Sequence, residues 1–363
     1  MRTKILFPLI LLVSISLLIK SSAIELSAKG ACAIEAQTGE IVCEKNSNAK
    51  MSMASTTKIM TAIVAIENSS LSKSFKIPKE AVGIEGSSIY LTEGEELTNE
   101  ELLYALLLES ANDASVALAI SCAGSVDVFV EMMNQKAKEL GLTSTSFSNP
   151  HGLDDENHYT TPYELAKIAQ YAMKNPVFRK IASTYKKTIP SGEDGTRVLI
   201  NHNKLLKTYV GTVGIKTGFT KKSGRCLVSC AQRNGVEIVC VTLNAPDDWN
   251  DHKAMLDYGF NQYEAITLAS PGDFNVSFSV QNGETSNVSC SNKETLSLTL
   301  KSGYGDISTR CVPNKALSAP VKAGDIVGKI IFTYNEKEIA YLNLYANENI
   351  NKKKNSFLER IFG

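Results

Sequence analysis

Three short motifs in this chain combine residue types that can carry out acyl transfer. Ser55-Thr-Thr-Lys58 supplies a hydroxyl and an amine, Ser110-Ala-Asn112 a second hydroxyl with an amide, and Lys216-Thr-Gly218 a cation beside a third hydroxyl. A serine hydroxyl is a weak nucleophile until an adjacent base removes its proton. The three motifs supply such a base without a histidine, in a chain that has only four histidines.

The first motif needs a helix to bring its two side chains together. Residues three apart lie on the same face of a helix, so Lys58 can reach the Ser55 oxygen. Lys58 accepts a proton only while it is neutral, and both burial and a nearby cation lower the pKa of a lysine. Lys216 is the expected cation. Backbone N–H groups at the start of the helix would also favour developing negative charge near Ser55.

Each motif alone has an ordinary structural explanation. Ser55 would be a serine at the start of a helix, the second motif would cap helices, and Lys216 would be a solvated lysine on an edge strand. A second Ser-x-x-Lys pattern, Ser70-Leu-Ser-Lys73, occurs without any accompanying context. The occurrence of all three motifs in order along one chain favours a functional site.

Helix signals surround the first two motifs. Thr98 and Glu101 form a capping box for a helix that continues to Leu108 and places Ser110 just beyond its end. Apolar residues recur at helical spacing after the nucleophile candidate: Ile59, Met60, Ile63 and Val64.

Two more helices are expected after the second motif. One runs from Val126 to about Leu140 and stops at Gly141. The other begins at Thr161-Pro162, where the threonine is the cap, the proline occupies the first turn and Glu164 completes a capping box.

Strand signals lie at both ends of the same region. Residues 31–43 resemble a β-hairpin, and Asn234-Gly235 between two β-rich segments is a strong hairpin signal. A helix over residues 257–263 would close the domain. We therefore expect residues 24–265 to form an α/β (α+β) domain, with one antiparallel sheet that joins both chain ends around a central helical block.

The character of the sequence changes after this region. Three alternating segments, residues 274–280, 296–300 and 330–334, are separated by Gly and Asn turns. This pattern predicts a small all-β domain over residues 269–346, which carries none of the three motifs.

The first 23 residues have the layout of a secretory signal peptide: a basic start, an apolar run and small residues before a cleavage site near Ala23. The alternative is a membrane anchor, but the apolar run is short of the roughly 20 residues that span a bilayer. Residues 1–23 hold three of the 38 basic residues and no acidic ones, which leaves 35 basic against 38 acidic residues. No basic stripe with interleaved aromatic residues is present, so no nucleic-acid partner is expected.

The eight cysteines are scattered and contain no Cys-x-x-Cys pair, so we expect no metal site and no cofactor. Most are expected to be free or buried thiols. Cys32 and Cys43 would face each other across the first hairpin if its turn is tight, and Cys290 and Cys311 are a second candidate pair.

The C-terminal residues 350–363 combine Lys352-Lys353-Lys354 with an apolar helical arc. As an amphipathic helix, this tail would associate weakly with an anionic membrane surface. The alternative is a disordered basic end. The apolar arc consists of Phe357, Leu358, Ile361 and Phe362.

The motifs and their surroundings resemble the low-molecular-weight penicillin-binding proteins, serine-type D-alanyl-D-alanine carboxypeptidases (peptidase S11-like) that trim peptidoglycan stem peptides. The resemblance covers nearly the whole chain after the predicted signal peptide. It is carried by the segments Ala36-Gln-Thr-Gly-Glu40, Ala54-Ser-Thr-Thr-Lys-Ile-Met-Thr61, Leu108-Glu-Ser-Ala-Asn-Asp-Ala114, Asn149-Pro-His-Gly-Leu153, His158-Tyr-Thr-Thr161, Gly214-Ile-Lys-Thr-Gly-Phe-Thr220 and Pro320-Val-Lys-Ala-Gly-Asp325.

This resemblance implies a penicillin-recognising serine-enzyme fold and assigns a role to each motif residue. Ser55 would be the nucleophile, Lys58 its base, Ser110 a proton relay and Asn112 a substrate-holding amide. The third motif, Lys216-Thr217-Gly218, would bind the terminal carboxylate of D-alanine. The backbone N–H groups of Ser55 and Phe219 would form the oxyanion hole.

The resemblance also implies a substrate, inhibitors and a location. The enzyme would remove the terminal D-alanine from peptidoglycan stem pentapeptides, and β-lactams would acylate it covalently. It would act outside the cytoplasm, in the cell wall or at the outer face of the cytoplasmic membrane.

Two features depart from the family pattern: Val213 replaces a frequent aspartate, and residues 246–251 are acidic where relatives are often basic. His151 and His158 are expected to pack and to form hydrogen bonds.

Three other functions are compatible with part of this pattern. A class A β-lactamase has aspartate where this chain has Ala111, and it would lack the β-rich C-terminal domain. A non-catalytic wall-binding protein would usually have lost at least one motif. A DD-endopeptidase that cuts peptidoglycan crosslinks is the nearer alternative, because the motifs do not define where the peptide is cut.

Overall fold

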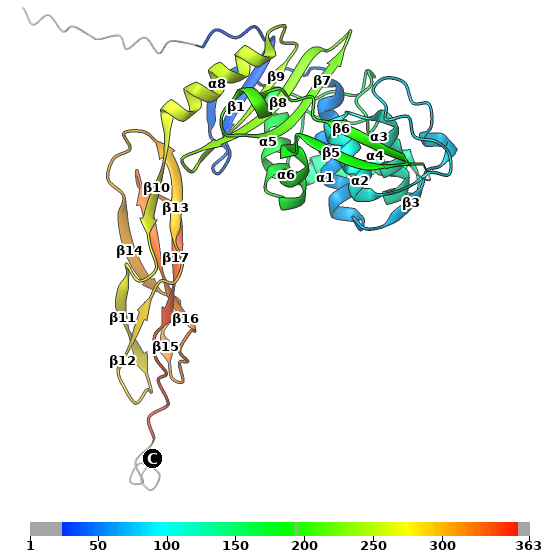
Figure 1. The fold of residues 1–363 in the computed structure, drawn as a ribbon. Coiled ribbons are helices and arrows are strands. Elements are labelled where there is room, and N and C mark those ends of the chain that lie inside the picture. The colour runs from blue at the N-terminus through cyan, green and yellow to red at the C-terminus, as the bar shows by residue number, and fades with distance from the viewer. Residues whose placement is uncertain (1–23, 193–194, 355–363) are drawn as a thin grey trace, which may run out of the picture.

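The computed structural model describes residues 24–192 and 195–354, which form two parts (Figure 1). A mixed α/β part precedes an elongated all-β part that extends away from it. The predicted signal peptide at residues 1–23 lies outside the described residues, as does the tail beyond residue 354. Residues 350–352 are described, and they form isolated bridges with the all-β part, from Ile350 to Val321 and from Lys352 to Gly283.

A five-stranded antiparallel sheet joins the two ends of the α/β part, as predicted. Its strand order is β2-β1-β9-β8-β7. The Asn234-Gly235 turn links β8 to β9 with positive φ at both residues, which a type I′ hairpin requires. The strands are β1 (Gly30–Glu35), β2 (Ile41–Lys45), β7 (Thr212–Thr220), β8 (Gly224–Arg233) and β9 (Val236–Leu243).

Helices cover both faces of this sheet because successive strand residues point to opposite sides. One face packs on α8 (Asp248–Gln262), whose Met255 and Leu256 join a core with Ala31 and Ile238. The opposite face packs on α5 (Pro162–Met173) and α6 (Pro176–Ser183). The helix predicted over residues 257–263 is therefore the end of a longer element that begins at Asp248.

The helical block surrounds α1 (Lys58–Asn68), which follows the 3₁₀ turn η1 (Ala54–Thr57) and is buried from Lys58 to Ala65. The capping box at Thr98 is present, and α2 ends at Leu108 as predicted. Around α1 lie α2 (Asn99–Leu108), α3 (Asn112–Ala123) and α4 (Val126–Glu139); short elements complete the block: β3 (Ser74–Lys76), η2 (Lys79–Ala81), β4 (Glu96–Thr98) and α7 (Leu205–Thr208).

No single helix among the described residues is long and apolar enough to cross a bilayer. The adjoining helices α3 and α4 pass a length and composition test together, but they are bent by 85°. All but three of the twelve α3 residues are buried within the protein.

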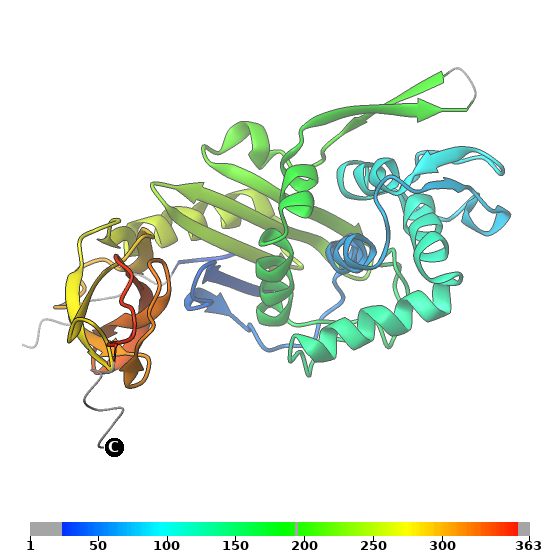
Figure 2. The same ribbon diagram turned by 90° about the horizontal axis from the view of Figure 1, so that it is seen from below.

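A two-stranded hairpin, β5 (Lys186–Ser191) with β6 (Gly195–Ile200), projects from this block (Figure 2). Arg197 on β6 is ion-paired with the buried Glu95, and its Nε donates to the Ile89 carbonyl over 2.8 Å. These contacts fasten the hairpin to the loop between η2 and β4.

The all-β part was predicted from the sequence, and the structure shows that it has its own core and two sheets. A six-stranded sheet has the order β14-β16-β17-β12-β11-β15, and β10 pairs with β13. Its core includes Val288, Ile330 and Phe332. The strands are β10 (Tyr263–Ala269), β11 (Asn275–Gln281), β12 (Asn287–Ser291), β13 (Leu296–Lys301), β14 (Ser308–Pro313), β15 (Leu317–Ser318), β16 (Ile326–Tyr334) and β17 (Lys337–Ala346).

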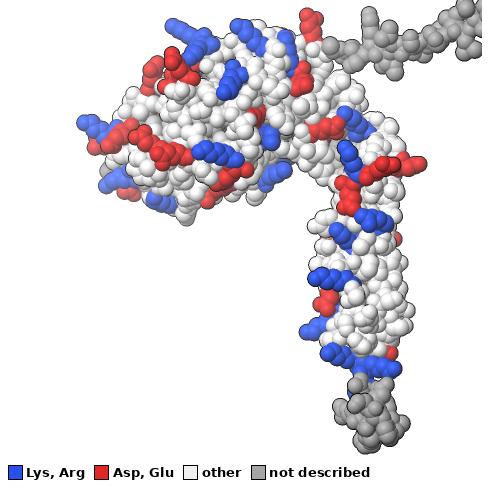
Figure 3. Space-filling model, turned by 180° about the vertical axis from the view of Figure 1, so that it is seen from behind, with Lys and Arg blue, Asp and Glu red and all other residues white. Residues whose placement is uncertain are grey.

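The first hairpin contacts the all-β part through the β1–β2 turn. The Thr299 N–H donates to the Gln37 side chain over 2.8 Å, and Lys301 pairs with Glu40 at 2.5 Å. Basic and acidic side chains are interspersed over both parts on the face shown in Figure 3.

Two local predictions were wrong. A register shift between Ala33 and Ile34 leaves Ala33 opposite Cys43 and Cys32 opposite Glu44, so the two cysteines point to opposite faces of the hairpin. Glu164 does not complete a capping box; its carboxylate instead accepts hydrogen bonds from residues 143–145. Cys290 is buried on β12, Cys311 is exposed on β14, and both are free thiols.

Candidate active site

The predicted nucleophile lies in a tightly held turn at the start of the central helix. Ala54, just before Ser55, has a positive φ of 48°, a conformation that residues other than glycine rarely adopt. Thr57 donates its hydroxyl to the Ala54 carbonyl over 2.8 Å, and Thr56 donates to Met53 over 2.6 Å. These contacts hold the backbone that presents Ser55.

Lys58 contacts Ser55 and two fixed acceptors. Its Nζ lies 2.9 Å from Ser55 Oγ, 2.6 Å from Asn112 Oδ1 and 2.6 Å from the His151 carbonyl oxygen. A neutral amine has two hydrogens and one lone pair. If both hydrogens go to the two carbonyl-type acceptors, the lone pair is left for the Ser55 hydroxyl, which is the geometry that a general base needs.

The surroundings of Lys58 favour its neutral form. The side chain is fully buried, and this burial lowers the pKa of Lys58 well below its usual value. The nearby positive charge of Lys216 lowers it further, whereas Asp113 opposes the shift. Burial and the Lys216 charge are the two causes that the sequence predicted.

Asn112 is held in place by the loop between η2 and β4. Its backbone N–H donates to the Ser87 carbonyl over 2.7 Å, and its Nδ2 donates to the Glu85 carbonyl over 2.5 Å. The second contact orients Oδ1 towards Lys58. A β-carbon on Gly86 would lie 2.7 Å from Asn112 Nδ2, so only glycine permits this approach.

Ser110 occupies the junction of α2 and α3 with a positive φ of 62°. It is 4% exposed and lines the same pocket as Ser55 and Thr217. Among the described residues it makes no direct hydrogen bond to Ser55 or Lys58. The structure thus brings Ser110 to the site without showing a completed proton relay.

The third motif packs directly on the nucleophile turn. A β-carbon on Gly218 would lie 3.0 Å from the Ser55 nitrogen, so a larger residue would push β7 away from η1. Lys216 is 1% exposed and donates to the Thr217 carbonyl over 2.9 Å. Burial lowers the pKa of Lys216 to about 7, with Glu109 opposing the shift.

A pocket of about 360 Å³ joins residues from the three motifs. Five of the predicted site residues line it: Ser55, Ser110, Thr217, Gly218 and Phe219. The other three, Lys58, Asn112 and Lys216, are buried and are not among the lining residues. Sequence reasoning assigned no role to the other lining residues, which are Ser87, His202, Lys204, Arg225, Cys226, Asp248 and Trp249.

Residues 149–153, which include His151, pack against the turn that carries Ser55. A β-carbon on Gly152 would lie 2.1 Å from the Ala54 carbonyl oxygen, so the two backbones are in close contact. The Gly152 N–H donates to Asn149 Oδ1 over 2.7 Å. The sequence pattern marked this segment as typical of the family but gave no sign that its backbone holds Lys58.

The two histidines near the site are neutral packing residues, which agrees with the expectation. Burial is the main cause that lowers the pKa of both His151 and His158 to about 4. The Ser148 N–H donates to Nδ1 of His158 over 3.1 Å. The opposite nitrogen then carries the proton and donates to the Thr57 hydroxyl over 2.7 Å.

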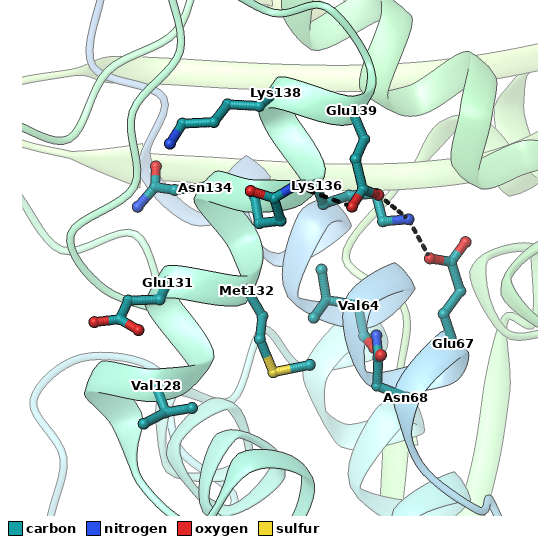
Figure 4. A pocket seen from close by; sticks show the side chains of 11 residues that line it. Val64, Glu67, Asn68, Val128, Glu131, Met132, Asn134, Lys136, Lys138 and Glu139 are labelled. Atoms are coloured by element: carbon teal, nitrogen blue, oxygen red, sulfur yellow. Dashed lines mark hydrogen bonds and ion pairs between the residues drawn. The ribbon is translucent and has the colours of Figure 1, made fainter.

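A larger surface pocket, of about 710 Å³, lies elsewhere, between α1 and α4 (Figure 4). Lys136 forms ion pairs there with Glu67 at 2.8 Å and with Glu139 at 3.0 Å. None of the three motifs contributes a residue to it, so its size does not make it the site.

Comparison with known proteins gives the same assignment along the chain. Residues 18–247 match the D-alanyl-D-alanine carboxypeptidase family, peptidase S11, and residues 263–352 match the C-terminal domain of penicillin-binding protein 5. The D-alanyl-D-alanine carboxypeptidase DacF of Bacillus subtilis is 33% identical over 355 residues, covering 95% of this chain and 91% of the relative. DacC of Escherichia coli is 30% identical, covering 90% and 84%.

Solved structures match most of the chain, across both of its parts. Penicillin-binding protein 5 from Haemophilus influenzae has a TM-score of 0.70 at 26% identity, covering 91% of this chain and 99% of that one. The peptidoglycan synthesis regulatory factor PBP3 from Streptococcus pneumoniae has a TM-score of 0.78 at 27% identity, covering 90% and 100%. With its three motifs gathered at one pocket and both of its parts matched, the chain belongs to the D-alanyl-D-alanine carboxypeptidase family, peptidase S11.

Proposed function

We propose that this protein is a serine-type D-Ala-D-Ala carboxypeptidase that removes the terminal D-alanine from peptidoglycan stem pentapeptides. The observation that carries the proposal is the position of Lys58 Nζ, 2.9 Å from Ser55 Oγ, with two other acceptors for its hydrogens. The curated relatives reported above are named as carboxypeptidases of this type.

Acylation begins when Lys58 takes the Ser55 hydroxyl proton. The Ser55 oxygen then attacks the carbonyl carbon of the penultimate D-alanine, and the backbone N–H groups of Ser55 and Phe219 stabilise the oxyanion. Ser110 passes a proton from Lys58 to the departing nitrogen, the C–N bond breaks and D-alanine leaves. Water activated by Lys58 hydrolyses the ester and restores Ser55.

The third motif recognises the substrate end. Lys216 supplies positive charge and Thr217 a hydroxyl for the free carboxylate of D-alanine. Gly218 lets the substrate backbone approach the strand. Asn112 orients Lys58 and contacts the substrate amide.

A β-lactam offers the same carbonyl and carboxylate in one molecule. We infer that penicillins acylate Ser55 and act as covalent inhibitors.

Because peptidoglycan lies outside the cytoplasm, the enzyme would act there, which agrees with the predicted signal peptide. The tail remains a proposal for peripheral membrane contact, and no cofactor has a role in this mechanism.

The experiment is to incubate the purified protein, without its signal peptide, with a pentapeptide that ends in D-Ala-D-Ala. Released D-alanine and a shortened peptide are expected, and Ser55→Ala should abolish both. Ser70→Ala is the matched control, because it changes the exposed second Ser-x-x-Lys and should retain activity. Cleavage of crosslinked dimers without release of D-alanine would instead identify a DD-endopeptidase.

A further inference from the structure

Arg225, on the strand beside the third motif, lines the active-site pocket. Arg225 is the second residue of β8, and the register places it opposite Phe219, just as Leu227 lies opposite Thr217. Opposite residues of an antiparallel pair share a face, and so do residues two apart on one strand. Arg225 and Thr217 are therefore diagonal neighbours on one face, roughly 7–8 Å apart at the backbone.

Two residues at the start of α8 hold the Arg225 side chain. Its Nε and Nη2 donate to the same carboxylate oxygen of Asp248, over 3.1 and 2.7 Å. The Asp248 side chain is 3% exposed, so this carboxylate is buried, whereas the Arg225 side chain is 43% exposed. The Trp249 ring lies 5.6 Å from the guanidinium carbon, within the range of a cation–π contact.

This arrangement leaves one edge of the guanidinium available. Arginine has five N–H donors, and Asp248 engages one on Nε and one on Nη2. In the part of the chain that the structure describes, Nη1 has no acceptor. The free Nη1/Nη2 edge can donate two parallel hydrogen bonds to a second carboxylate, which is the geometry that arginine favours.

The pocket otherwise lacks a fixed permanent cation. Lys58 acts while neutral, and the pKa of Lys216 is lowered by burial to about 7. Lys204 also lines the pocket, but it is exposed, and no described residue holds its ammonium group. Arginine stays charged at every relevant pH.

We propose that Arg225 binds the free C-terminal carboxylate of the substrate together with the Thr217 hydroxyl, and that Asp248 and Trp249 orient it. The proposal rests on the carboxypeptidase function proposed above and adds a residue that selects acids over amides. It also gives the acidic segment 246–251 a role: this segment supplies the carboxylate and the ring that hold an arginine from the neighbouring strand.

The test compares a pentapeptide acid ending in D-Ala-D-Ala with the same peptide as its C-terminal amide. Arg225→Gln should lower kcat/KM for the acid by about 10- to 100-fold, the size of a lost hydrogen bond to a charged group. The amide should change by less than about 3-fold, because it lacks the charge. Arg225→Lys should fall between the two, since it keeps the charge and loses the second donor edge.

Two further variants distinguish carboxylate binding by Arg225 from a general loss of stability. Arg179→Gln breaks a comparable ion pair with Glu237 outside the pocket and should leave the acid-to-amide ratio unchanged. The double variant Arg225→Gln/Asp248→Asn removes the buried charge that the single variant leaves unpaired, and it should show the same loss of discrimination with a restored unfolding temperature.

Unchanged discrimination in Arg225→Gln, or equal losses on acid and amide, would overturn the proposal. The proposal would also be overturned if Lys204→Gln alone abolished the preference for the acid over the amide. Acylation by benzylpenicillin and by its methyl ester provides the second readout, because the ester lacks the charged carboxylate. The proposed function would be overturned if penicillin acylated the parent enzyme but the enzyme released no D-alanine. The comparison of benzylpenicillin with its methyl ester would then decide whether Arg225 binds the carboxylate.

Discussion

The carbonyl oxygen of His151 lies 2.6 Å from Nζ of Lys58. This contact comes from the backbone, so it depends on the path of the chain through residues 149–153 and not on the imidazole ring. Together with Asn112 Oδ1, it directs the lone pair of a neutral Lys58 towards Ser55. The base is thus positioned by a loop as well as by its own helix.

The first prediction follows from the closeness of this loop to the nucleophile turn. Gly152→Ala would place a β-carbon 2.1 Å from the Ala54 carbonyl oxygen, which must displace either Ser55 or the carbonyl that holds Lys58. We expect penicillin acylation of Ser55 to fall by 100-fold or more, since misplacement of about 1 Å costs on this order. Stopped-flow measurement of the acylation rate checks this.

Gly141→Ala is the matched control for this change. Gly141 also has a positive φ, but a β-carbon there would meet nothing within 4 Å. It should cost about 1 kcal/mol of stability through backbone strain alone and leave acylation intact. Equal acylation rates in the two variants would show that the Gly152 contact does not position the site.

The local signals in the sequence predicted most of the architecture. The Thr98 capping box, the Asn234-Gly235 hairpin and the alternation after residue 269 each depend on neighbours a few residues apart. The three motifs could likewise be recognised because each is short. The structure then brings Ser55, Ser110 and Thr217 to one pocket.

The remaining parts depend on relationships that no short pattern encodes. The His151 carbonyl has no side-chain signature, and Arg225 meets Asp248 only after β8 and α8 have packed. An unbroken hairpin register would have paired Cys32 with Cys43, but the irregularity between Ala33 and Ile34 shifts the pairing by one residue. Such a shift turns a side chain to the other face of the sheet.

The second prediction concerns the pH dependence of Lys216. Burial lowers its pKa to about 7, so the fraction that is protonated falls as pH rises through that value. If carboxylate binding requires protonated Lys216, kcat/KM for a peptide acid should fall about 30-fold between pH 6 and 8.5, as the protonated fraction does for a pKa of about 7. Lys216→Gln should lose most turnover and should no longer show this decline.

The peptide amide is the internal control for the Lys216 prediction. It lacks the carboxylate, so it should be a poor substrate whose rate does not decline over the same range. Identical pH profiles for acid and amide would remove Lys216 from carboxylate binding.

The third prediction is that Cys32 and Cys43 are both free thiols. The register sends Cys32 into the core between the sheet and α5, whereas Cys43 packs on the α8 side. A disulfide needs the two β-carbons within about 4.5 Å on converging vectors. Alkylation of the exported protein, unfolded without reductant, should modify both residues, as mass spectrometry of the peptides would show.

The last prediction links His158 to stability at acid pH. Burial lowers the pKa of His158 to about 4, whereas a histidine in an unfolded chain titrates near 6.5. Between these values the unfolded chain binds more protons than the native protein, so the free energy of unfolding rises with pH across this window and falls on acidification. The contribution of His158 should be on the order of 3 kcal/mol, complete above pH 6.5 and lost below pH 4.

His158→Gln tests this because an amide can keep the contacts to Ser148 and Thr57 but cannot titrate. Urea unfolding at pH 7.5 and pH 5 should show a smaller loss of stability on acidification for the variant than for the parent protein. His202→Gln is the control, because His202 is exposed and pairs with Glu109 at the surface. An equal acid-induced loss in parent and His158→Gln would mean that proton uptake by His158 does not drive the destabilisation.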